Sequence, residues 1–219
     1  MRQFQASYRV SLDPEIPSSP FRSSQERQKE RSLKRHAVLQ AAVRMFNERG
    51  FHATSLDEVA ASLGVTKPVI YHYLGNKDQV LFECVRLGLT QIREAAVAAR
   101  GQEGTGLDRL KAFLRRYAEI NMDDFGRCVI RTGDETLSPE SRREFRALKG
   151  EIDREMREVI AEGVADGSIH APDVRLTAFT LAGALNWPAR WFNPEGRDDR
   201  REVAAAMVEI LCEGLRCRD

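Results

Sequence analysis

The chain has 219 residues, with 34 Lys and Arg against 33 Asp and Glu, and a formal net charge of +1. This balance excludes a uniformly basic nucleic-acid binder, so any affinity for DNA has to come from a local asymmetry of charge. A hydrophobic fraction of 42% is enough for a folded core. No apolar run approaches the ~18 residues that a membrane span needs, and the first residues lack the pattern of a signal peptide. A cytoplasmic protein of one or two domains is expected.

The sequence contains no recognisable catalytic, metal or cofactor site. There is no G-x-S-x-G and no H-E-x-x-H motif. Without a C-x-x-C pair or companion histidines, the cysteines are expected to be reduced thiols packed as small apolar groups. These cysteines are Cys84, Cys128, Cys212 and Cys217. The histidines also lack a nucleophile or a metal ligand at a useful spacing, so an enzyme is not expected.

The N-terminal segment, residues 1–28, is predicted to be a mobile arm because Pro14, Pro17 and Pro20 interrupt it and no period is sustained. Between Arg22 and Arg35, six basic residues stand against two acidic ones. Two interpretations remain open. The segment is either a solvated linker that leads into the first helix, or an arm that follows DNA phosphates or enters the minor groove.

A first helix is expected from Ser32 to Glu48, with an apolar stripe on one face and Gly50 just after its end. The next stretch has the signals of two short helices joined by a tight turn. Ser55 and Glu58 have the spacing of a capping box for a helix from Leu56 to Leu63. Gly64 allows the positive φ of the turn, and Thr66 can cap a second helix from Lys67 to Leu74. This order is typical of a helix-turn-helix.

The outward face of the second short helix carries more donors, aromatic edges and positive charge than a helix of two turns can bury. Lys67 can donate to a base edge or a phosphate, and the apolar groups of the helix can contact thymine methyls. Tyr73, His72 and Lys77 can donate to phosphates. Each residue alone also fits a packing, capping or solvated role, and Tyr71 and Tyr73 could be half-buried packing aromatics. The predicted DNA-contacting residues are Thr54, Thr66, Lys67, Pro68, Val69, Tyr71, His72, Tyr73 and Lys77.

Residues 35–81 resemble the DNA-binding domain of the tetracycline-repressor (TetR) family. The markers are Phe46, Gly50-Phe51, Thr54-Ser55, Val59-Ala60, Gly64-Val65-Thr66-Lys67, Ile70-Tyr71-His72-Tyr73-Leu74 and Asn76-Lys77. One departure is Leu74-Gly75, where the family usually has an aromatic followed by a basic or polar residue. The resemblance implies a homodimeric, ligand-responsive regulator of transcription, usually a repressor, with operator DNA and a small-molecule effector as partners.

The rest of the chain has a helical pattern throughout, and the expected fold is all-α with about nine helices. Asn76 is expected to cap a helix from Lys77 to about Arg100, and Gly101, Gly104 and Gly106 mark a flexible break after it. Further helices are expected from Leu107, from Pro139 after the cap Ser138, after Asp173 and from about Asp198. The predicted division is a helix-turn-helix domain over residues 29–77 and a helical ligand-binding and dimerisation domain over residues 78–219.

The chain's two tryptophans, Trp187 and Trp191, lie one helical turn apart, with Pro188 between them to kink the helix. They are either anchors of a dimer interface or part of the ligand cavity. The segment is similar to one in regulators of fatty-acid, steroid or aromatic catabolism, which respond to acyl-CoA thioesters. Arg127, Arg131 and Arg190 could then hold the phosphates. The alternatives are a regulator that senses a free hydrophobic compound, as in efflux control, and a helical enzyme that does not bind DNA.

Overall fold

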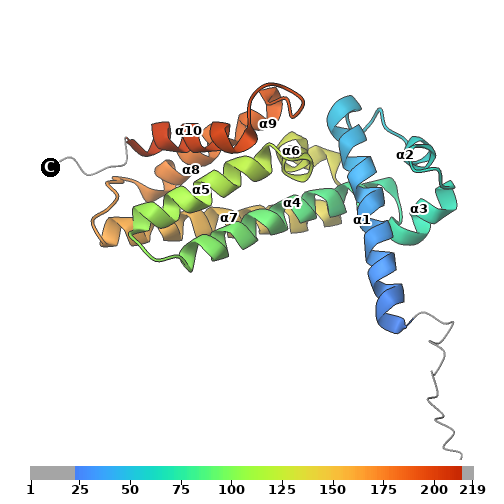
Figure 1. The fold of residues 1–219 in the computed structure, drawn as a ribbon, viewed down its shortest axis with the longest axis horizontal. Coiled ribbons are helices and arrows are strands. Elements are labelled where there is room, and N and C mark those ends of the chain that lie inside the picture. The colour runs from blue at the N-terminus through green and yellow to red at the C-terminus, as the bar shows by residue number, and fades with distance from the viewer. Residues whose placement is uncertain (1–22, 214–219) are drawn as a thin grey trace, which may run out of the picture. The chain divides into compact units, whose positions relative to one another are not determined.

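The computed structural model describes residues 23–213, and in this part of the chain all regular structure is helical (Figure 1). The prediction of an all-α fold is therefore confirmed. The elements are α1 (Ser24–Arg49), α2 (Leu56–Ser62), α3 (Lys67–Leu74), α4 (Lys77–Arg100), α5 (Gly106–Asn121), α6 (Asp124–Arg131), a 3-10 helix η1 (Asp134–Thr136), α7 (Pro139–Ala165), α8 (Val174–Asn186), α9 (Pro188–Trp191) and α10 (Arg200–Glu213).

Helix α1 begins at Ser24, eight residues before the predicted start at Ser32. Ser23 and Glu26 form reciprocal capping hydrogen bonds, with Ser23 N donating to Glu26 Oε2 at 2.7 Å and Glu26 N donating to Ser23 Oγ at 3.1 Å. Residues 24–28, which were assigned to the arm, are thus helical, while residues 1–22 of that prediction lie outside the described residues. By packing, the described residues before Arg35 belong to one unit, and those from Arg35 onward form a second compact unit.

Helices α1, α2 and α3 share a small apolar core within the second unit. Val38, Ala42 and Phe46 on α1 are buried, as are Val59 on α2 and Ile70 on α3. The stripe predicted on the first helix therefore packs as expected. This core buries the inner faces of α2 and α3, so the opposite face of α3 is not used in packing within the core.

The helical body is built around α4, α5 and α7, which lie side by side in Figure 1 and contact one another along their lengths. Phe113 on α5 and Phe145 and Ile160 on α7 are fully buried among them. Helix α6 packs against α4 and α5, α8 against α7 and α5, and α10 against α5. Among residues 23–213, no helix has both the length and the apolar character needed to cross a bilayer.

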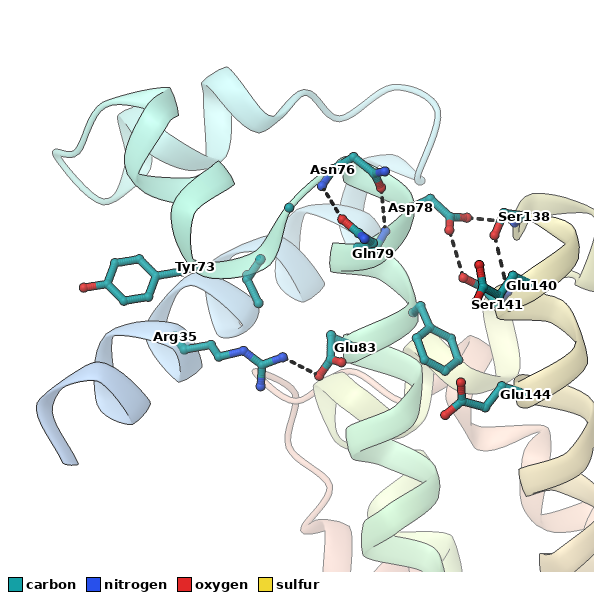
Figure 2. A pocket seen from close by; sticks show the side chains of 13 residues that line it. Arg35, Tyr73, Asn76, Asp78, Gln79, Glu83, Ser138, Glu140, Ser141 and Glu144 are labelled. Carbon is teal, nitrogen blue, oxygen red and sulfur yellow. Dashed lines mark hydrogen bonds and ion pairs between the residues drawn. The ribbon is translucent and has the colours of Figure 1, made fainter. Parts of the chain in front are cut away.

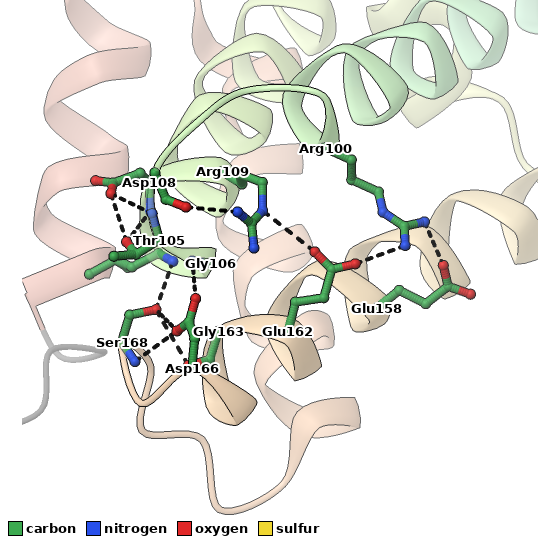
Figure 3. Close-up of polar contacts among 12 residues, drawn as sticks. Arg100, Thr105, Gly106, Asp108, Arg109, Glu158, Glu162, Gly163, Asp166 and Ser168 are labelled. Atoms are coloured by element: carbon green, nitrogen blue, oxygen red, sulfur yellow. Dashed lines mark hydrogen bonds and ion pairs between the residues drawn. The ribbon is translucent and has the colours of Figure 1, made fainter.

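The glycine-rich segment after α4 leads into a capped and closely packed start of α5. Thr105 caps α5 in a capping box with Asp108. Gly106, the first residue of α5, lies against Gly163 of α7, and a Cβ atom built on Gly106 would be 2.2 Å from the Gly163 Cα atom. The Gly106 N–H donates to Asp166 Oδ2 at 2.6 Å, and Ser168 donates to the same carboxyl group (Figure 3). The glycine therefore allows a close crossing of two helices.

Cys84 and Cys128 are buried free thiols, as predicted; Cys212 is also buried, and Cys217 lies outside the described residues. Burial raises the pKa of the Cys128 thiol to about 12 and raises that of Cys84 as well. Both groups are therefore neutral and behave as small apolar side chains.

Candidate functional site

The turn between α2 and α3 has the geometry that its sequence predicts. Ser55 N donates to Glu58 Oε2 at 2.8 Å, and Glu58 N donates to Ser55 Oγ at 3.1 Å, so both halves of the capping box are formed. The hydrogen bonds from Ser55 to the Glu58 carboxylate lower the pKa of Glu58. Gly64 has a φ of 64°, in the left-handed region, and this conformation turns the chain toward α3.

Helix α3 turns Ile70 and Leu74 inward, where both are buried, and presents its other face to solvent. Lys67, Pro68, Tyr71 and His72 are exposed, with 46% of Tyr71 accessible. Val69 and Tyr73 are half-buried. Thr66 is the N-cap residue but its side chain makes no capping hydrogen bond, which leaves this exposed hydroxyl available. The aromatic face of α3 is thus open rather than sealed inside the fold.

Two lysines border a shallow hollow of about 290 Å³ beside this face. Lys67 Nζ lies 2.8 Å from Asp57 Oδ2, and this hydrogen bond with the Asp57 carboxylate raises the pKa of Lys67. Lys77 Nζ lies 4.4 Å from the centre of the Phe51 ring and 3.4 Å from the His52 carbonyl oxygen. Burial lowers the pKa of Lys77. Both ammonium groups are thus held at defined positions on one surface.

The junction between α3 and α4 is fixed by a second set of polar contacts, drawn in Figure 2. Gly75 has a φ of 75°, and Asn76 and Gln79 form the capping box of α4. Asp78, in the first turn of α4, points toward the start of α7 and accepts hydrogen bonds from Ser138 N and the Ser141 hydroxyl. The end of the exposed helix is therefore tied to the helical body.

A larger pocket of about 990 Å³ lies where α1, α6, α9 and the segment before α10 meet. Arg127 and Arg131 of α6 line it together with Arg190 and Trp191 of α9. The structure thus brings together four of the five residues predicted to bind an effector. The fifth, Trp187, does not line this pocket and is 61% exposed. Pro188 separates α8 from α9 at this point, as the predicted kink requires.

Six arginines and six carboxylates line the pocket, but the charges are not evenly paired. Asp124 pairs with Arg44, Asp123 pairs with Arg200, and Asp199 caps α10. In the described part of the chain no carboxylate pairs with Arg127 or Arg190, and the Arg127 Nε atom is buried without a hydrogen-bond partner. Burial and the nearby charges of Arg127 and Arg190 lower the pKa of Arg131. The arrangement is suited to an anionic ligand.

A buried polar cluster positions the end of α8 and therefore the start of α9. Asn121 Nδ2 donates to the Leu185 carbonyl at 3.3 Å and to Asn186 Oδ1 at 3.0 Å. The Tyr117 hydroxyl also donates to Asn186 Oδ1, at 2.7 Å. Burial raises the pKa of Tyr117, so this hydroxyl remains a neutral donor. Because these bonds hold the last turn of α8, they also orient the pocket residues Arg190 and Trp191 that follow it.

Models of known protein families match both parts of the chain. Residues 38–84 match the model described as bacterial regulatory proteins of the tetR family. Residues 103–215 match the model of the tetracyclin repressor-like C-terminal domain, which alone spans more than half of the chain. The chain belongs to the tetR family. It is therefore a DNA-binding regulator that responds to a small molecule, in agreement with the resemblance of residues 35–81.

Individual relatives agree with this assignment. The tetR-family chain is 25% identical over 215 residues to the transcriptional repressor KstR2 of Mycolicibacterium smegmatis, an alignment that covers 93% of this chain and 96% of KstR2. It is 34% identical over 83 residues to the regulator BetI of Rhizobium meliloti, but this match spans only 38% of the chain and 41% of BetI. A crystal structure of AibR in complex with isovaleryl coenzyme A and operator DNA has 27% identity and a TM-score of 0.71, and the match covers 81% of this chain and 97% of AibR.

One predicted DNA contact of this tetR-family chain needs correction. Thr54 is 2% exposed. Its hydroxyl donates to the carbonyls of Gly50 (2.9 Å) and Met45 (3.2 Å), and its N–H donates to the Phe51 carbonyl. Because both groups proposed for a phosphate contact are used inside the protein, Thr54 instead holds the end of α1 against the loop before α2.

Two acidic residues that organise the site were not predicted from the sequence. Asp57 pairs with Lys67, as described above. Asp124 binds α1, since its Oδ2 accepts from Gln40 (2.7 Å) and Arg44 (3.1 Å) of that helix. Asn47 of α1 also donates to the Asp124 carbonyl at 2.8 Å. These partners are about 80 residues apart in the chain, and no local pattern could have paired them.

Proposed function

We propose that this regulator is a repressor that binds a palindromic operator as a homodimer and releases it when an effector binds. Residues 29–77 would read the DNA, and residues 78–219 would bind the effector and form the dimer. The open outer face of α3, with Lys67, Tyr71 and His72 exposed, is the observation that carries the proposal. A helix seated in the major groove by its outer face needs donors and apolar edges there.

The remaining predicted contacts have separate roles in this proposal. Thr66, Pro68, Val69, Tyr73 and Lys77 surround the open face, and Thr54 supports it from inside the fold. Lys77 and the hydroxyls of Thr66 and Tyr73 would contact phosphates, which position the protein without reading sequence. Two copies of α3, related by a two-fold axis, would enter successive major grooves ~34–36 Å apart.

The dimer would form through α8 and α10. These two helices, together with Trp187 just after α8, expose several large apolar side chains, although such groups are usually buried. They are Leu176 (54% exposed), Phe179 (50%), Trp187 (61%) and Ile210 (73%). We assign Trp187 to this interface and Trp191 to the pocket. Phe179→Glu should give a monomer in analytical ultracentrifugation, whereas Val97→Glu, at an exposed apolar residue of α4, should leave the dimer intact.

We assign the effector site to the pocket lined by Arg127, Arg131, Arg190 and Trp191. Unpaired arginines next to aromatic and apolar surface suit a ligand with both phosphate and apolar parts, such as an acyl-coenzyme A thioester. KstR2 is named a transcriptional repressor, and the AibR structure contains isovaleryl coenzyme A together with operator DNA. These relatives support the assignment by analogy, while the arginines support it by their chemistry.

Helix α6 would pass the signal to the DNA-binding part. Its Arg131 lines the pocket and also donates to the Asn47 carbonyl at the end of α1, and its Asp124 binds Gln40 and Arg44 of the same helix. A ligand that draws the arginines inward would move α6 against α1 and favour a different spacing of the two α3 helices. A coupling of ~1–3 kcal/mol would weaken operator binding roughly 5- to 150-fold.

The test begins with a duplex selected by the wild-type protein from a random 20-base-pair library. Acyl-coenzyme A thioesters of increasing chain length are then added in a mobility-shift titration, beside the matching free acids and coenzyme A alone. We expect at least one thioester to release the duplex and the free acids to have no effect. In Arg127→Gln, the thioester concentration needed for release should rise by roughly 10- to 100-fold, because a charged hydrogen bond is lost.

Arg154→Gln is the matched control, because Arg154 is an exposed arginine of α7 that lies outside this pocket. Release by free hydrophobic compounds but not by thioesters would point instead to a regulator of the efflux type and would overturn the effector assignment. Failure of the selection to enrich any duplex would overturn the DNA-binding proposal itself.

A further inference from the structure

Asp57 lies on the surface that we propose faces DNA. It is the one carboxylate among the residues that line the hollow beside α3, which also holds Lys67, Tyr71 and Lys77. Its Oδ2 atom accepts a hydrogen bond from Lys67 Nζ at 2.8 Å, across the turn between α2 and α3. The Asp57 side chain is 62% exposed and that of Lys67 is 46% exposed, so the pair is open to solvent.

Fold stability does not account for this pair. An exposed ion pair contributes little to the free energy of unfolding, because water and salt screen it and two side chains lose freedom. Affinity for DNA does not account for it either. A carboxylate in the hollow repels phosphates and offsets one of the two lysine charges. The remaining property that the pair can improve is the difference in affinity between one DNA sequence and another.

We propose that Asp57 is a specificity-determining residue that acts through Lys67. The hydrogen bond holds the Lys67 ammonium beside the start of α2, so a phosphate can engage this lysine only in competition with the carboxylate. On random DNA, where phosphates supply most of the binding energy, Lys67 therefore contributes little. On the operator, α3 is seated in the groove, and Lys67 can donate to a base edge while another of its three protons stays on Asp57.

This inference rests on the proposed role of α3, and the experiment separates the two. Dissociation constants are measured for the selected duplex and for a scrambled duplex of the same length and composition. In Asp57→Asn, binding to the scrambled duplex should tighten by roughly 5- to 10-fold, and its salt dependence should steepen by about one counterion, because Lys67 is released to phosphates. Binding to the selected duplex should change by about twofold or less, so the specificity ratio falls.

Three variants decide whether Asp57 acts through the lysine. In a Lys67→Gln background, Asp57→Asn should shift both dissociation constants alike and leave their ratio unchanged. Asp57→Glu should retain the wild-type ratio because it keeps a charged carboxylate that can accept from Lys67. The proposal would be overturned if Asp57→Asn kept the wild-type specificity ratio. It would also be overturned if Asp57→Asn lowered the specificity ratio equally in the wild-type and Lys67→Gln backgrounds. A circular-dichroism melt of each variant confirms that the fold is kept. A wild-type protein that selects no duplex would instead refute the proposed function.

Discussion

Asp78 and Ser141 join the first turn of α4 to the first turn of α7, with the Ser141 hydroxyl donating to Asp78 Oδ2 at 2.9 Å. The other carboxylate oxygen of Asp78 accepts from Ser138 N at 2.8 Å. The Asp78 side chain therefore caps the start of α7, although Asp78 itself lies in α4. Asp78, Ser138 and Ser141 are among the residues that line a pocket of about 600 Å³, shown in Figure 2, where the end of α3 meets the starts of α4 and α7. The orientation of α3 is thus tied to α7 at its point of exit.

Asp78→Ala should lower the free energy of unfolding by about 1–3 kcal/mol, because Ser138 N and Ser141 lose a partly buried acceptor. It should also reduce the effect of the effector, measured as the operator affinity without thioester divided by the affinity with saturating thioester. The reason is that movements of the helical body would no longer be transmitted to α3. Ser141→Ala, which removes one of the two hydrogen bonds, should have a smaller effect on both quantities. An unchanged affinity ratio in Asp78→Ala would show that the signal reaches α3 by another route, such as α6 and α1.

Lys77 and Tyr71 border the same hollow but are expected to act differently on DNA. Lys77→Ala should weaken binding to specific and scrambled duplexes alike, by roughly 3- to 10-fold, and make the salt dependence shallower by about 0.9, as expected for one lost phosphate contact. Tyr71→Ala should instead change the sequence recovered by selection from a random library. Equal losses on both duplexes for both variants would contradict this division of roles.

Thr54→Val tests the structural role that replaces the predicted phosphate contact. The valine keeps the shape but leaves the carbonyls of Gly50 and Met45 without the hydroxyl that now donates to them. The free energy of unfolding should fall by about 1–3 kcal/mol in a urea titration. At a temperature where the variant is fully folded, its salt dependence on DNA should match that of the wild type. A shallower salt dependence would restore Thr54 to the set of phosphate contacts.

The short helices could be located from sequence because their ends are specified by adjacent residues. Ser55 with Glu58 and Asn76 with Gln79 are capping pairs three residues apart, and a glycine with positive φ lies at each turn. Helices α3 and α4 accordingly run over the predicted residues, and α2 ends one residue earlier. The start of α1 was not predicted because the segment before Ser32 is rich in arginine, lysine and glutamate and has no apolar period, although its cap, Ser23 with Glu26, follows the same rule.

The parts of the site that were not predicted depend on contacts between distant residues. The chemistry of Arg127, Arg131 and Arg190 makes them candidates from the sequence, but their meeting in one pocket with Trp191 depends on the packing of α6 against α9. The burial of Thr54 follows from carbonyls left free at the end of α1, which a list of candidate hydroxyls does not reveal. Trp187 is exposed because it lies at the break between α8 and α9, just before Pro188. The sequence does not show which way a side chain at such a break will point.

Asp166, at the end of α7, should make the stability of this protein depend on pH in acid. The Ser168 hydroxyl, the Gly106 N–H and the Ser168 N–H all donate to its carboxylate and lower its pKa, in that order of importance. A carboxyl group with a depressed pKa in the folded state stabilises the fold above its unfolded pKa of about 3.9. This contribution is lost as the pH falls through the lower, folded-state pKa.

Asp166→Asn should therefore have a lower melting temperature than the wild type at pH 7, because the amide oxygen cannot accept all three hydrogen bonds. The difference between the two proteins should stay constant from neutral pH down to about 5 and narrow below about 4. Other carboxylates with lowered pKa values that do not interact with Asp166, such as those of Glu58 and Asp134, weaken both proteins alike in acid, so they do not contribute to the difference. A difference that persists unchanged to pH 3 would show that the loss in Asp166→Asn comes from packing rather than from the charge.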